Sequence, residues 1–197
     1  MNAAQTRFSG SGAQRQLKQA AVEYAGHGWP VVPVSFYQAG RYTCVQADCA
    51  ENTLHPVWRM WQGRASANPK TVAAWYGLLA FAVAVRTGVC FDVVSVPDVV
   101  ATRVQAALAA QHTPTPVAVW RERRRRLFWV AHDLPWRAAL EHVEARVHGD
   151  GDWVPVPPTP TRYGQLQWAM PPEQTDWGFV GHEAFHNALA AVDADRP

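Results

Sequence analysis

Short apolar runs alternate along this chain with longer helical stretches, and this alternation limits the fold classes open to the sequence. Six runs are rich in valine and aromatic residues, which favour strands: 29–34, 81–85, 90–94, 117–120, 127–131 and 153–156. Five stretches are predicted as helices: 17–25, 69–75, 97–111, 136–143 and 180–192. The stretches 36–67 and 155–172 show neither pattern and are predicted as loops. The alternation predicts an α/β or α+β protein, with a mixed sheet flanked by helices.

The length of 197 residues fits a single domain with small appendages. We expect a flexible leader at 1–16, the main domain at 17–172, and a C-terminal helix with a tail at 173–197. Hydrophobic residues make up 48% of the chain and 10 residues are tryptophan, which is enough to fill a core and excludes wholesale disorder. The net charge of +2 is too small to predict nucleic-acid binding by itself.

The cysteine content and the apolar runs bear on where the protein resides. An odd count of 3 cysteines suits a reducing compartment better than a disulfide scaffold. Residues 1–16 are polar and show no secretory signal. The longest apolar run, 78–85, is far shorter than the ~20 residues that cross a bilayer. The sequence therefore predicts a soluble, cytoplasmic protein that does not associate with membranes.

An arginine cluster fills the turn between the predicted strands 117–120 and 127–131. Its members are Arg121, Arg123, Arg124, Arg125 and Arg126. Guanidinium groups bind phosphate oxygens in pairs, and Trp120 and Trp129 would offer stacking faces beside them. So dense a cluster of one charge repels itself, and a bound anion would relieve that repulsion. We therefore interpret the turn as a phosphate-binding loop. A solvated hairpin turn is the alternative interpretation.

Two thiols and an imidazole lie close together in the long stretch 36–67. Cys44, Cys49 and His55 carry soft donor atoms of the kind that bind zinc. A fourth ligand is not obvious from the sequence. Two thiols and a histidine in an ordinary loop therefore remain the alternative to a zinc site.

A second metal-binding pattern lies near the C-terminus. His182, Glu183 and His186 match H-E-x-x-H, which on a helix puts both imidazoles on one face, as in zinc proteases. The 11 residues after His186 are too few for the usual downstream ligand. An amphipathic closing helix is the preferred interpretation, and a zinc hydrolase is the alternative.

Three stretches carry a further pattern in a set order and spacing. The first is AVEYAGHGWPVVP at 21–33, the second runs from Asn68-Pro69 through Trp75 to Thr87-Gly88, and the third is GDGDWVPVPP at 149–158. Together they resemble the N-terminal domain of bifunctional DNA primase/polymerases, within the archaeo-eukaryotic primase superfamily. The resemblance implies a primase/polymerase-like mixed sheet. It also implies nucleotide joining by two divalent ions (Mg²⁺ or Mn²⁺), held by paired carboxylates on adjacent strands together with a histidine and a third acidic residue.

Carried onto this sequence, the family's site loses most of its carboxylates. Ser95 and Pro97 fall at the paired carboxylate positions, Arg126 near the histidine position and Arg146 near the third acidic position. We expect Ser95, Arg126 and Arg146 to converge on one face. Asp92 lies an odd number of residues from Ser95 and so faces the opposite side of a regular strand, whereas Glu144 lies two residues from Arg146. Mg²⁺ or Mn²⁺ would lack anionic ligands in such a site.

These observations predict a primase/polymerase-like domain that binds DNA or nucleotides, with weak or no nucleotidyltransferase activity. Asp92, Ser95 and Glu144 occupy the degenerate catalytic positions, and the arginine cluster together with Arg146 is predicted to bind phosphate. The first alternative is a non-catalytic scaffold that keeps the fold for a protein partner. The second is the zinc hydrolase built on His182, Glu183 and His186.

Overall fold

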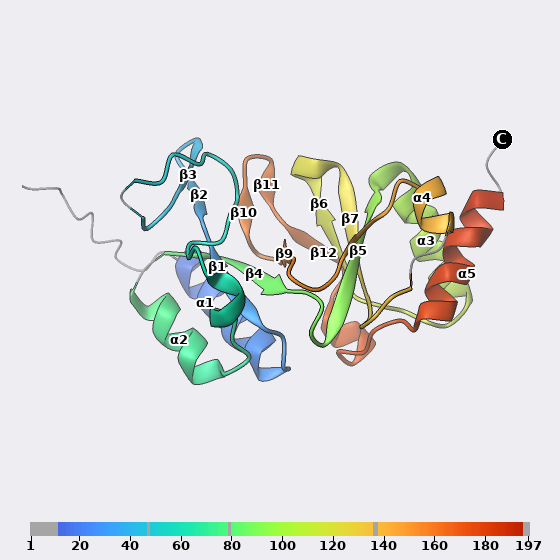
Figure 1. Cartoon of the computed structure of the whole chain (residues 1–197), viewed down its shortest axis with the longest axis horizontal. Coiled ribbons are helices and arrows are strands. Elements are labelled where there is room, and N and C mark those ends of the chain that lie inside the picture. Colours follow the sequence, from blue (N-terminus) through green and yellow to red (C-terminus); the bar gives the residue numbers. More distant parts are fainter. Residues whose placement is uncertain (1–11, 47, 79, 136–137, 195–197) are drawn as a thin grey trace, which may run out of the picture.

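The computed structural model describes residues 12–46, 48–78, 80–135 and 138–194 (Figure 1). Within this part of the chain, two antiparallel sheets stand side by side. The larger has the strand order β12-β6-β7-β5-β8 and the smaller the order β1-β4-β9. Their strands are β1 (Val31–Val34), β4 (Ala82–Arg86), β5 (Phe91–Pro97), β6 (Val117–Trp120), β7 (Arg125–Ala131), β8 (Arg146–His148), β9 (Trp153–Pro155) and β12 (Gln167–Met170).

The long strand β5 lies between β7 and β8 and is buried over most of its length. Strands β6 and β7 pair antiparallel on either side of the arginine turn, which confirms the predicted hairpin. Strand β1, which contains Pro33, is an edge strand of the smaller sheet. An edge is where a residue without a backbone N–H fits a sheet.

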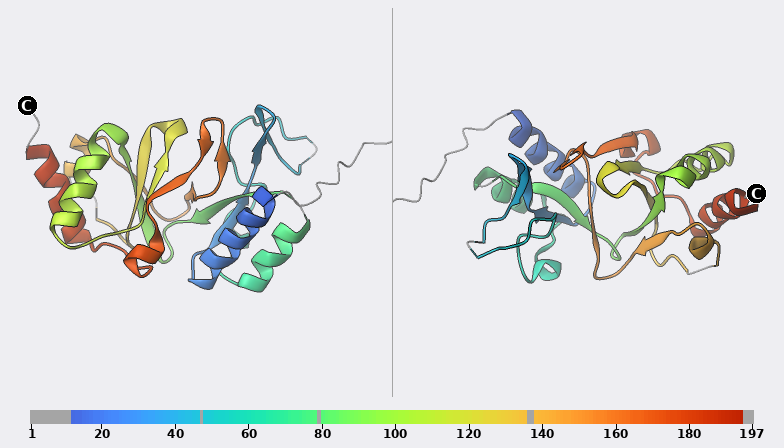
Figure 2. Two further views of the ribbon diagram at one scale, coloured as in Figure 1. Left: turned by 180° about the vertical axis from the view of Figure 1, so that it is seen from behind. Right: turned by 90° about the horizontal axis from the view of Figure 1, so that it is seen from above.

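Helices cover one face of the larger sheet (Figure 2). They are α3 (Asp98–Ala110), α4 (Ala138–His142) and α5 (His182–Ala194). The sheet contributes Val94 and Val96 of β5 and Phe128 and Val130 of β7 to this core, at the period of two expected for one face. Helix α5 shares this core with α3, so the C-terminal segment packs into the domain as far as the structure describes it.

The opposite face of the larger sheet packs against the smaller sheet and its helices α1 (Gly12–Gly26) and α2 (Pro69–Leu78). Trp29 and Trp129 stack here with their ring centroids 5.4 Å apart, and both are almost fully buried. Phe91 of β5 packs beside them. One continuous core therefore joins the two sheets, in agreement with the predicted single mixed domain.

The two sheets also meet where the turn after β4 touches the turn before β9. Gly88 has a φ of +73°, and a Cβ at this position would lie 2.1 Å from backbone atoms of Asp150, so only glycine fits. The Thr87 hydroxyl donates a hydrogen bond to the carbonyl of Gly149 at 2.7 Å. These residues belong to the second and third stretches that carry the family pattern. The fold thus brings those stretches into contact.

Several elements differ from the expectation. Helix α1 begins at Gly12, so the described part of the predicted leader is helical, and the rest of that leader lies outside the described residues. The predicted loops contain two small hairpins and a strand of the larger sheet, which are β2 (Phe36–Gln38) with β3 (Arg41–Thr43), β10 (Pro160–Thr161) with β11 (Gly164–Gln165), and β12. Short 3₁₀ turns complete the chain at η1 (Trp61–Arg64), η2 (Arg121–Arg123) and η3 (Pro172–Thr175).

One predicted helix is only partly described. Of the predicted helix 136–143, residues 138–142 form α4, and 136–137 lie outside the described residues. None of the helices in the described residues is long and apolar enough to cross a membrane.

Candidate functional site

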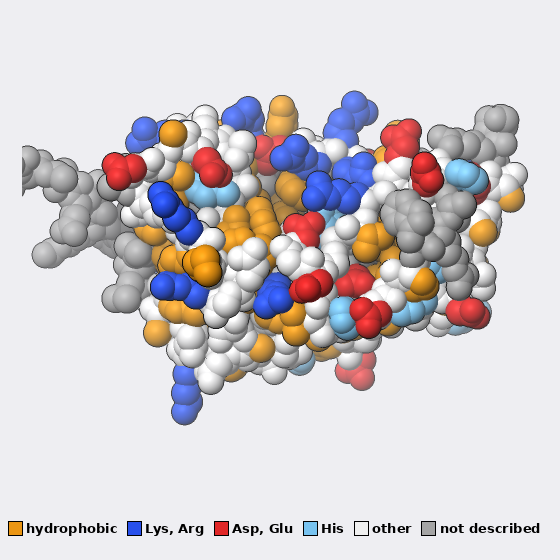
Figure 3. Space-filling view, in the orientation of Figure 1, with side chains coloured by type: hydrophobic (Ala, Val, Ile, Leu, Met, Phe, Trp, Pro, Cys, Tyr) orange, Lys and Arg blue, Asp and Glu red, His pale blue; other side chains and the backbone are white. Residues whose placement is uncertain are grey.

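A cavity of about 320 Å³ opens on the face of the larger sheet that looks toward the smaller one. A second cavity of about 220 Å³ adjoins it and reaches Trp153 of β9. Both are lined by Trp120, Arg123, Arg146 and His148, and the first is also lined by Ser95 and Arg125. We call the two together the arginine cleft. Figure 3 shows Lys and Arg side chains gathered over this part of the molecule.

The register of β5 determines which side chains face the cleft. Ser95 pairs with Arg146 across β5 and β8, and Pro97 pairs with Arg125 across β5 and β7. Paired residues point to the same side of a sheet, and residues two apart in a strand share a face. Ser95, Arg125 and Arg146 therefore lie together on the cleft face.

Arg125 is bound to β5 at the centre of this group. Its Nε donates to the Ser95 hydroxyl at 3.0 Å, and its Nη2 donates to the carbonyls of Ser95 at 2.7 Å and Glu144 at 2.6 Å. Burial lowers the pKa of Arg125, the Glu144 carboxylate opposes that shift, and the positive charge of Arg146 adds to it. An arginine stays protonated in proteins even so. The centre of the cleft is thus a fixed positive charge.

The wall formed by β8 carries a second charged network. The Nδ1 of His148 lies 2.7 Å from the Oδ2 of Asp152, and the Nη2 of Arg146 lies 3.4 Å from the same oxygen. Burial alone would raise the pKa of Asp152. Hydrogen bonds from His148 and from the backbone N–H of Trp153, together with the charges of His148 and Arg146, outweigh burial and lower this pKa. Asp152 therefore offsets part of the positive charge at the rim of the cleft.

The prediction that Arg126 shares the cleft face is wrong. Arg126 pairs with Val96, on the opposite side of the sheet. Its Nε donates to Asp98 at 2.9 Å and its Nη1 to Gln105 at 2.8 Å, both on helix α3. A shift of one residue along a strand moves a side chain to the other face, and Arg125 occupies the position that was expected for Arg126.

The two acidic residues of the predicted site are separated by the sheet. Asp92 is 4% exposed on the helix-covered face, where its Oδ2 accepts a hydrogen bond from the backbone N–H of Leu134 at 2.9 Å. Its Oδ1 lies 3.4 Å from the Nδ1 of His132. Glu144 lines the cleft beside Arg125, in a turn where its own φ is +54°. Of the two, only Glu144 is near Ser95.

A pair of divalent cations does not fit the donors of the cavity at Ser95. Among the described residues that line the cavity at Ser95, Glu144 is the one carboxylate. The Ser95 hydroxyl is already bonded to Arg125, and the two guanidinium groups would repel a cation. Mg²⁺ and Mn²⁺ sites need several hard oxygen ligands, and two-metal sites need shared carboxylates.

The candidate zinc residues do come together in space. One ligand atom from each of Cys44, Cys49 and His55 can be chosen so that all lie within 4.8 Å of one another. The His55 Nε2 faces the Cys49 sulfur at 3.3 Å, while its Nδ1 donates to the Thr53 carbonyl at 2.8 Å. Such a second hydrogen bond commonly orients a histidine that binds a metal. Burial raises the pKa of the Cys44 thiol, and the nearby Cys49 thiol raises it further.

The H-E-x-x-H residues have a different environment. The Nε2 of His182 lies 2.9 Å and 2.8 Å from the carbonyls of Ala131 and His132, and that of His186 lies 3.0 Å from the carbonyl of Pro135. Both imidazoles thus bond α5 to the end of β7 and the segment that follows it. In the part of the chain that the structure describes, neither histidine belongs to a group of three potential metal ligands. The geometry favours the closing-helix interpretation over the zinc hydrolase.

The comparisons with known proteins agree with the class that the fold and the position of the cleft suggest, a primase/polymerase-like domain. A family model described as "Bifunctional DNA primase/polymerase, N-terminal" matches residues 21–177. The match covers most of the chain, and the chain therefore belongs to this family. The family implies binding of nucleic acid or nucleotides, and its members typically use divalent metals. No curated protein and no solved structure matches the chain significantly.

Sequence reasoning missed two residues of the cleft. His148 and Asp152 line the cleft, and neither was identified from the sequence. The signal for His148 was present, because it lies two residues after Arg146 and must share its face if the segment is a strand. The role of Asp152 depends on its contact with His148 and had no comparable signal.

Proposed function

We propose that this domain binds the phosphates of nucleotides or nucleic acid in the arginine cleft and does not carry out two-metal nucleotidyl transfer. The observation that supports this most directly is the position of Arg125. Its guanidinium lies against Ser95, at the strand position where the family resemblance places the metal-binding carboxylates. A family site built to hold cations has become, in this chain, a site that attracts anions.

The donors of Arg125 suit a phosphate. Its Nε and Nη2 are bonded to β5 and to the Glu144 carbonyl, which fixes the plane of the guanidinium. Among the described residues, none forms a hydrogen bond with its Nη1, whose two N–H groups remain available. Arg146 and Arg123 line the same cavity, so a phosphate there would meet three guanidinium groups. Guanidinium groups that are already oriented lose little entropy on binding.

The rest of the cleft suits a nucleoside. Trp120 lines both cavities, the Arg123 guanidinium lies 5.7 Å from its ring centroid, and Trp153 and Leu54 line the second cavity. Among the described residues, the indole N–H of Trp120 has no hydrogen-bond partner. A base and sugar against these side chains, with phosphates toward Arg125, would occupy both cavities.

Nucleotide binding without metal provides the test. Calorimetric titration with ATP in the presence of a chelator should show binding, and Arg125→Ala should weaken it by about 10- to 100-fold, the effect of a lost charged hydrogen bond. Arg126→Ala is the matched control, because it removes the same charge one residue away on the other face of the sheet. Wild-type protein that binds ATP only with Mg²⁺, or that binds equally well after Arg125→Ala, would contradict the proposal.

Catalysis is tested separately. With Mg²⁺ or Mn²⁺ and a primed template, we expect little or no extension, because the cavity at Ser95 has Glu144 as its one carboxylate among the described residues and two metals need shared carboxylates. Robust extension that is lost in Glu144→Ala would show that a single carboxylate suffices. If the protein bound neither ATP nor DNA, the fold would instead serve as a scaffold for a protein partner.

We also propose a zinc ion at Cys44, Cys49 and His55, a site supported by the approach of their three ligand atoms to within 4.8 Å. The sulfur and imidazole donors suit Zn²⁺, whose sites usually have four ligands, so a water or Asp48 in the adjacent cavity would complete the set. The three free thiols fit a reducing compartment such as the cytoplasm.

Protein purified without chelator should contain about one zinc per chain by elemental analysis. Cys49→Ser should remove the zinc, and Cys90→Ser should not, since Cys90 lies outside the group. Equal zinc content in the wild type and Cys49→Ser would contradict the site.

A further inference from the structure

Three turns from distant parts of the chain meet beside the arginine cleft. They are the β2–β3 turn, the β10–β11 turn and the η2 turn between β6 and β7, and Figure 1 shows them along one edge of the molecule. Tyr42 of β3 joins them. Its hydroxyl donates to the Oε2 of Glu122 at 2.8 Å, and the backbone and charge of Arg162 act on the pKa of the same hydroxyl. We call this group of turns the three-turn crest.

The hydrogen bond between Tyr42 and Glu122 is protected by burial of the tyrosine. Tyr42 is 6% exposed. Burial raises the pKa of its hydroxyl, the bond to the Glu122 carboxylate raises it further, and Arg162 offsets part of the shift. The phenol therefore remains a donor at physiological pH and keeps Glu122 paired. This side chain links the β2–β3 turn to the η2 turn.

The crest carries an excess of positive charge. Its turn sequences are QAGR at 38–41, RERR at 121–124 and TRYG at 161–164, and they contain one acidic residue, Glu122. The arginines of these turns are all exposed: Arg41, Arg121, Arg123, Arg124 and Arg162. In Figure 3, Lys and Arg side chains lie along the same edge. Arg123 also lines the cleft, so the crest and the cleft form one continuous basic surface.

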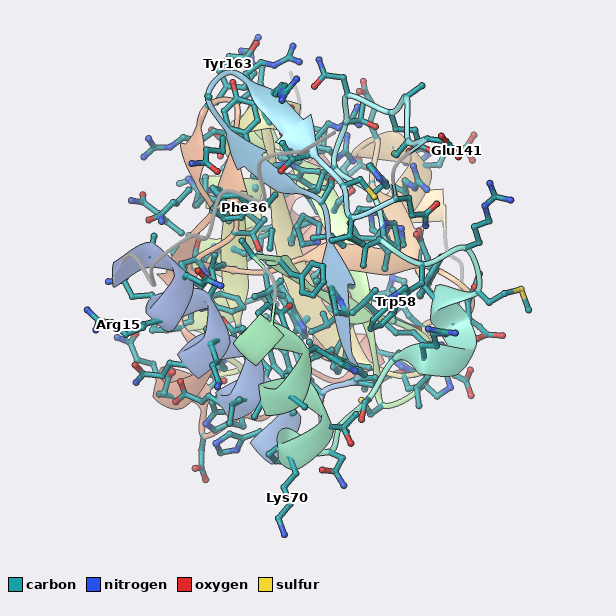
Figure 4. All side chains as sticks on the ribbon, turned by 90° about the vertical axis from the view of Figure 1, so that its left-hand side faces the viewer. Arg15, Phe36, Trp58, Lys70, Glu141 and Tyr163 are labelled. Atoms are coloured by element: carbon teal, nitrogen blue, oxygen red, sulfur yellow. The ribbon has the colours of Figure 1, made fainter. Side chains whose placement is uncertain are left out.

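An aromatic ring lies among these charges. Tyr163 is 60% exposed, whereas the other described aromatic residues are buried or half-buried. Its turn is held by the Thr161 hydroxyl, which donates to the Gly164 carbonyl at 2.6 Å and lies 3.3 Å from the Tyr163 backbone nitrogen. Figure 4 places Tyr163 at the outer edge of the molecule, next to the β2–β3 hairpin. An exposed ring among arginines is the arrangement on which unpaired bases stack.

We propose that the three-turn crest binds single-stranded nucleic acid, with a base stacked on Tyr163, phosphates on Arg41 and Arg162, and the strand continuing into the arginine cleft. The inference rests on the proposed function, since it names the polymer that the cleft serves. A duplex fits less well, because its bases are stacked on one another and do not offer a free face to Tyr163.

The test measures fluorescence anisotropy of labelled oligonucleotides about 12 nucleotides long, which is within the range that one single-strand-binding fold covers. DNA, RNA and an abasic DNA of the same length are the probes, so that the polymer and the base contribution are separated. Tyr163→Ala should weaken binding of the base-containing probes about tenfold and leave the abasic probe unchanged, whereas Tyr163→Phe should bind like the wild type.

The arginines are tested through salt dependence. The double variant Arg41→Ser/Arg162→Ser should flatten the slope of log affinity against log salt by about 0.7 for each lost phosphate contact. The control Arg15→Ser/Lys70→Ser removes the same charge from α1 and α2, which Figure 4 shows well away from Tyr163. This control should keep the wild-type slope.

Two results would overturn the inference: crest variants that bind all probes like the wild type, or an equal loss for the abasic probe after Tyr163→Ala. ATP binding in the same variants separates the two proposals. If ATP still binds through Arg125 while the crest variants change nothing, the crest inference fails and the proposed function stands. If the crest variants weaken DNA binding but ATP does not bind, the crest inference stands and the cleft proposal fails.

Discussion

The two faces of strand β5 place polar side chains in different surroundings. On the helix-covered face, Asp92 is buried and bonded to a backbone N–H of the segment after β7. On the cleft face, β5 contributes Ser95 and Pro97, the positions at which the resemblance places the paired acids, and the neighbouring strands contribute Arg125 and Arg146. The one carboxylate of β5 lies where it can stabilise the fold, and the carboxylate in the cavity at Ser95 comes from the turn at Glu144.

This contrast shows why counting acidic residues near the family's motif is misleading. Asp92 is three residues from Ser95, but the sheet separates the two side chains. A carboxylate held by a backbone N–H at 2.9 Å, at 4% exposure, has a structural reason to persist without any catalytic role. The cleft face of this chain carries the guanidinium groups of Arg125 and Arg146, and such a surface favours an anionic ligand.

The largest expected effect is a loss of stability when Asp92 on the buried face of β5 is replaced. Asp92→Ala would leave the Leu134 N–H buried without a partner, and we expect the free energy of unfolding to fall by about 1–3 kcal/mol. Urea denaturation followed by circular dichroism measures this change. Asp92→Asn keeps an oxygen for the Leu134 N–H and should lose less.

ATP affinity of the folded Asp92→Ala protein should equal that of the wild type, since Asp92 does not line the cleft. The contrast between the faces would be broken if Asp92→Ala kept full stability but lost ATP binding. That result would return Asp92 to the functional site.

The next largest effect is a loss of ATP affinity when Ser95 on the cleft face is replaced by an acid. Ser95→Asp would place a carboxylate against the Nε of Arg125, and the resulting ion pair should compete with phosphate and weaken ATP binding about tenfold. Ser95→Asn introduces a neutral side chain of nearly the same shape as aspartate. It therefore separates the effect of the charge from the effect of the larger size. Unfolding midpoints show whether either variant disturbs the sheet. Unchanged ATP affinity in Ser95→Asp would mean that the phosphates do not lie at Arg125.

Local patterns predicted the helices α3 and α5 and the hairpin of β6 and β7, because each depends on residues near one another in the chain. Strand β12 was missed since its partner is β6, nearly 50 residues earlier, and its proline-rich surroundings are typical of a loop. For the site, motif spacing put Ser95 and Arg146 on one face but gave Arg126 instead of Arg125. A one-residue difference in register reverses the face and is fixed only by strand pairing.

The smallest expected effect concerns Asp152, which balances the charge of the cleft face. Its pKa is lowered in the folded protein, so its stabilising contribution is complete above the unfolded value of about 3.9 and is lost as the pH falls through the lower folded value. Asp152→Asn keeps an oxygen for the Trp153 N–H but removes the charge next to His148 and Arg146. The variant should therefore be less stable than the wild type near pH 6, and the difference should shrink below about pH 4. Urea denaturation at a series of pH values measures this, and Asp150→Asn controls for the loss of a largely exposed charge from the same turn. A stability difference that grows as the pH falls would mean that Asp152 is not the group that offsets the positive charge of the cleft.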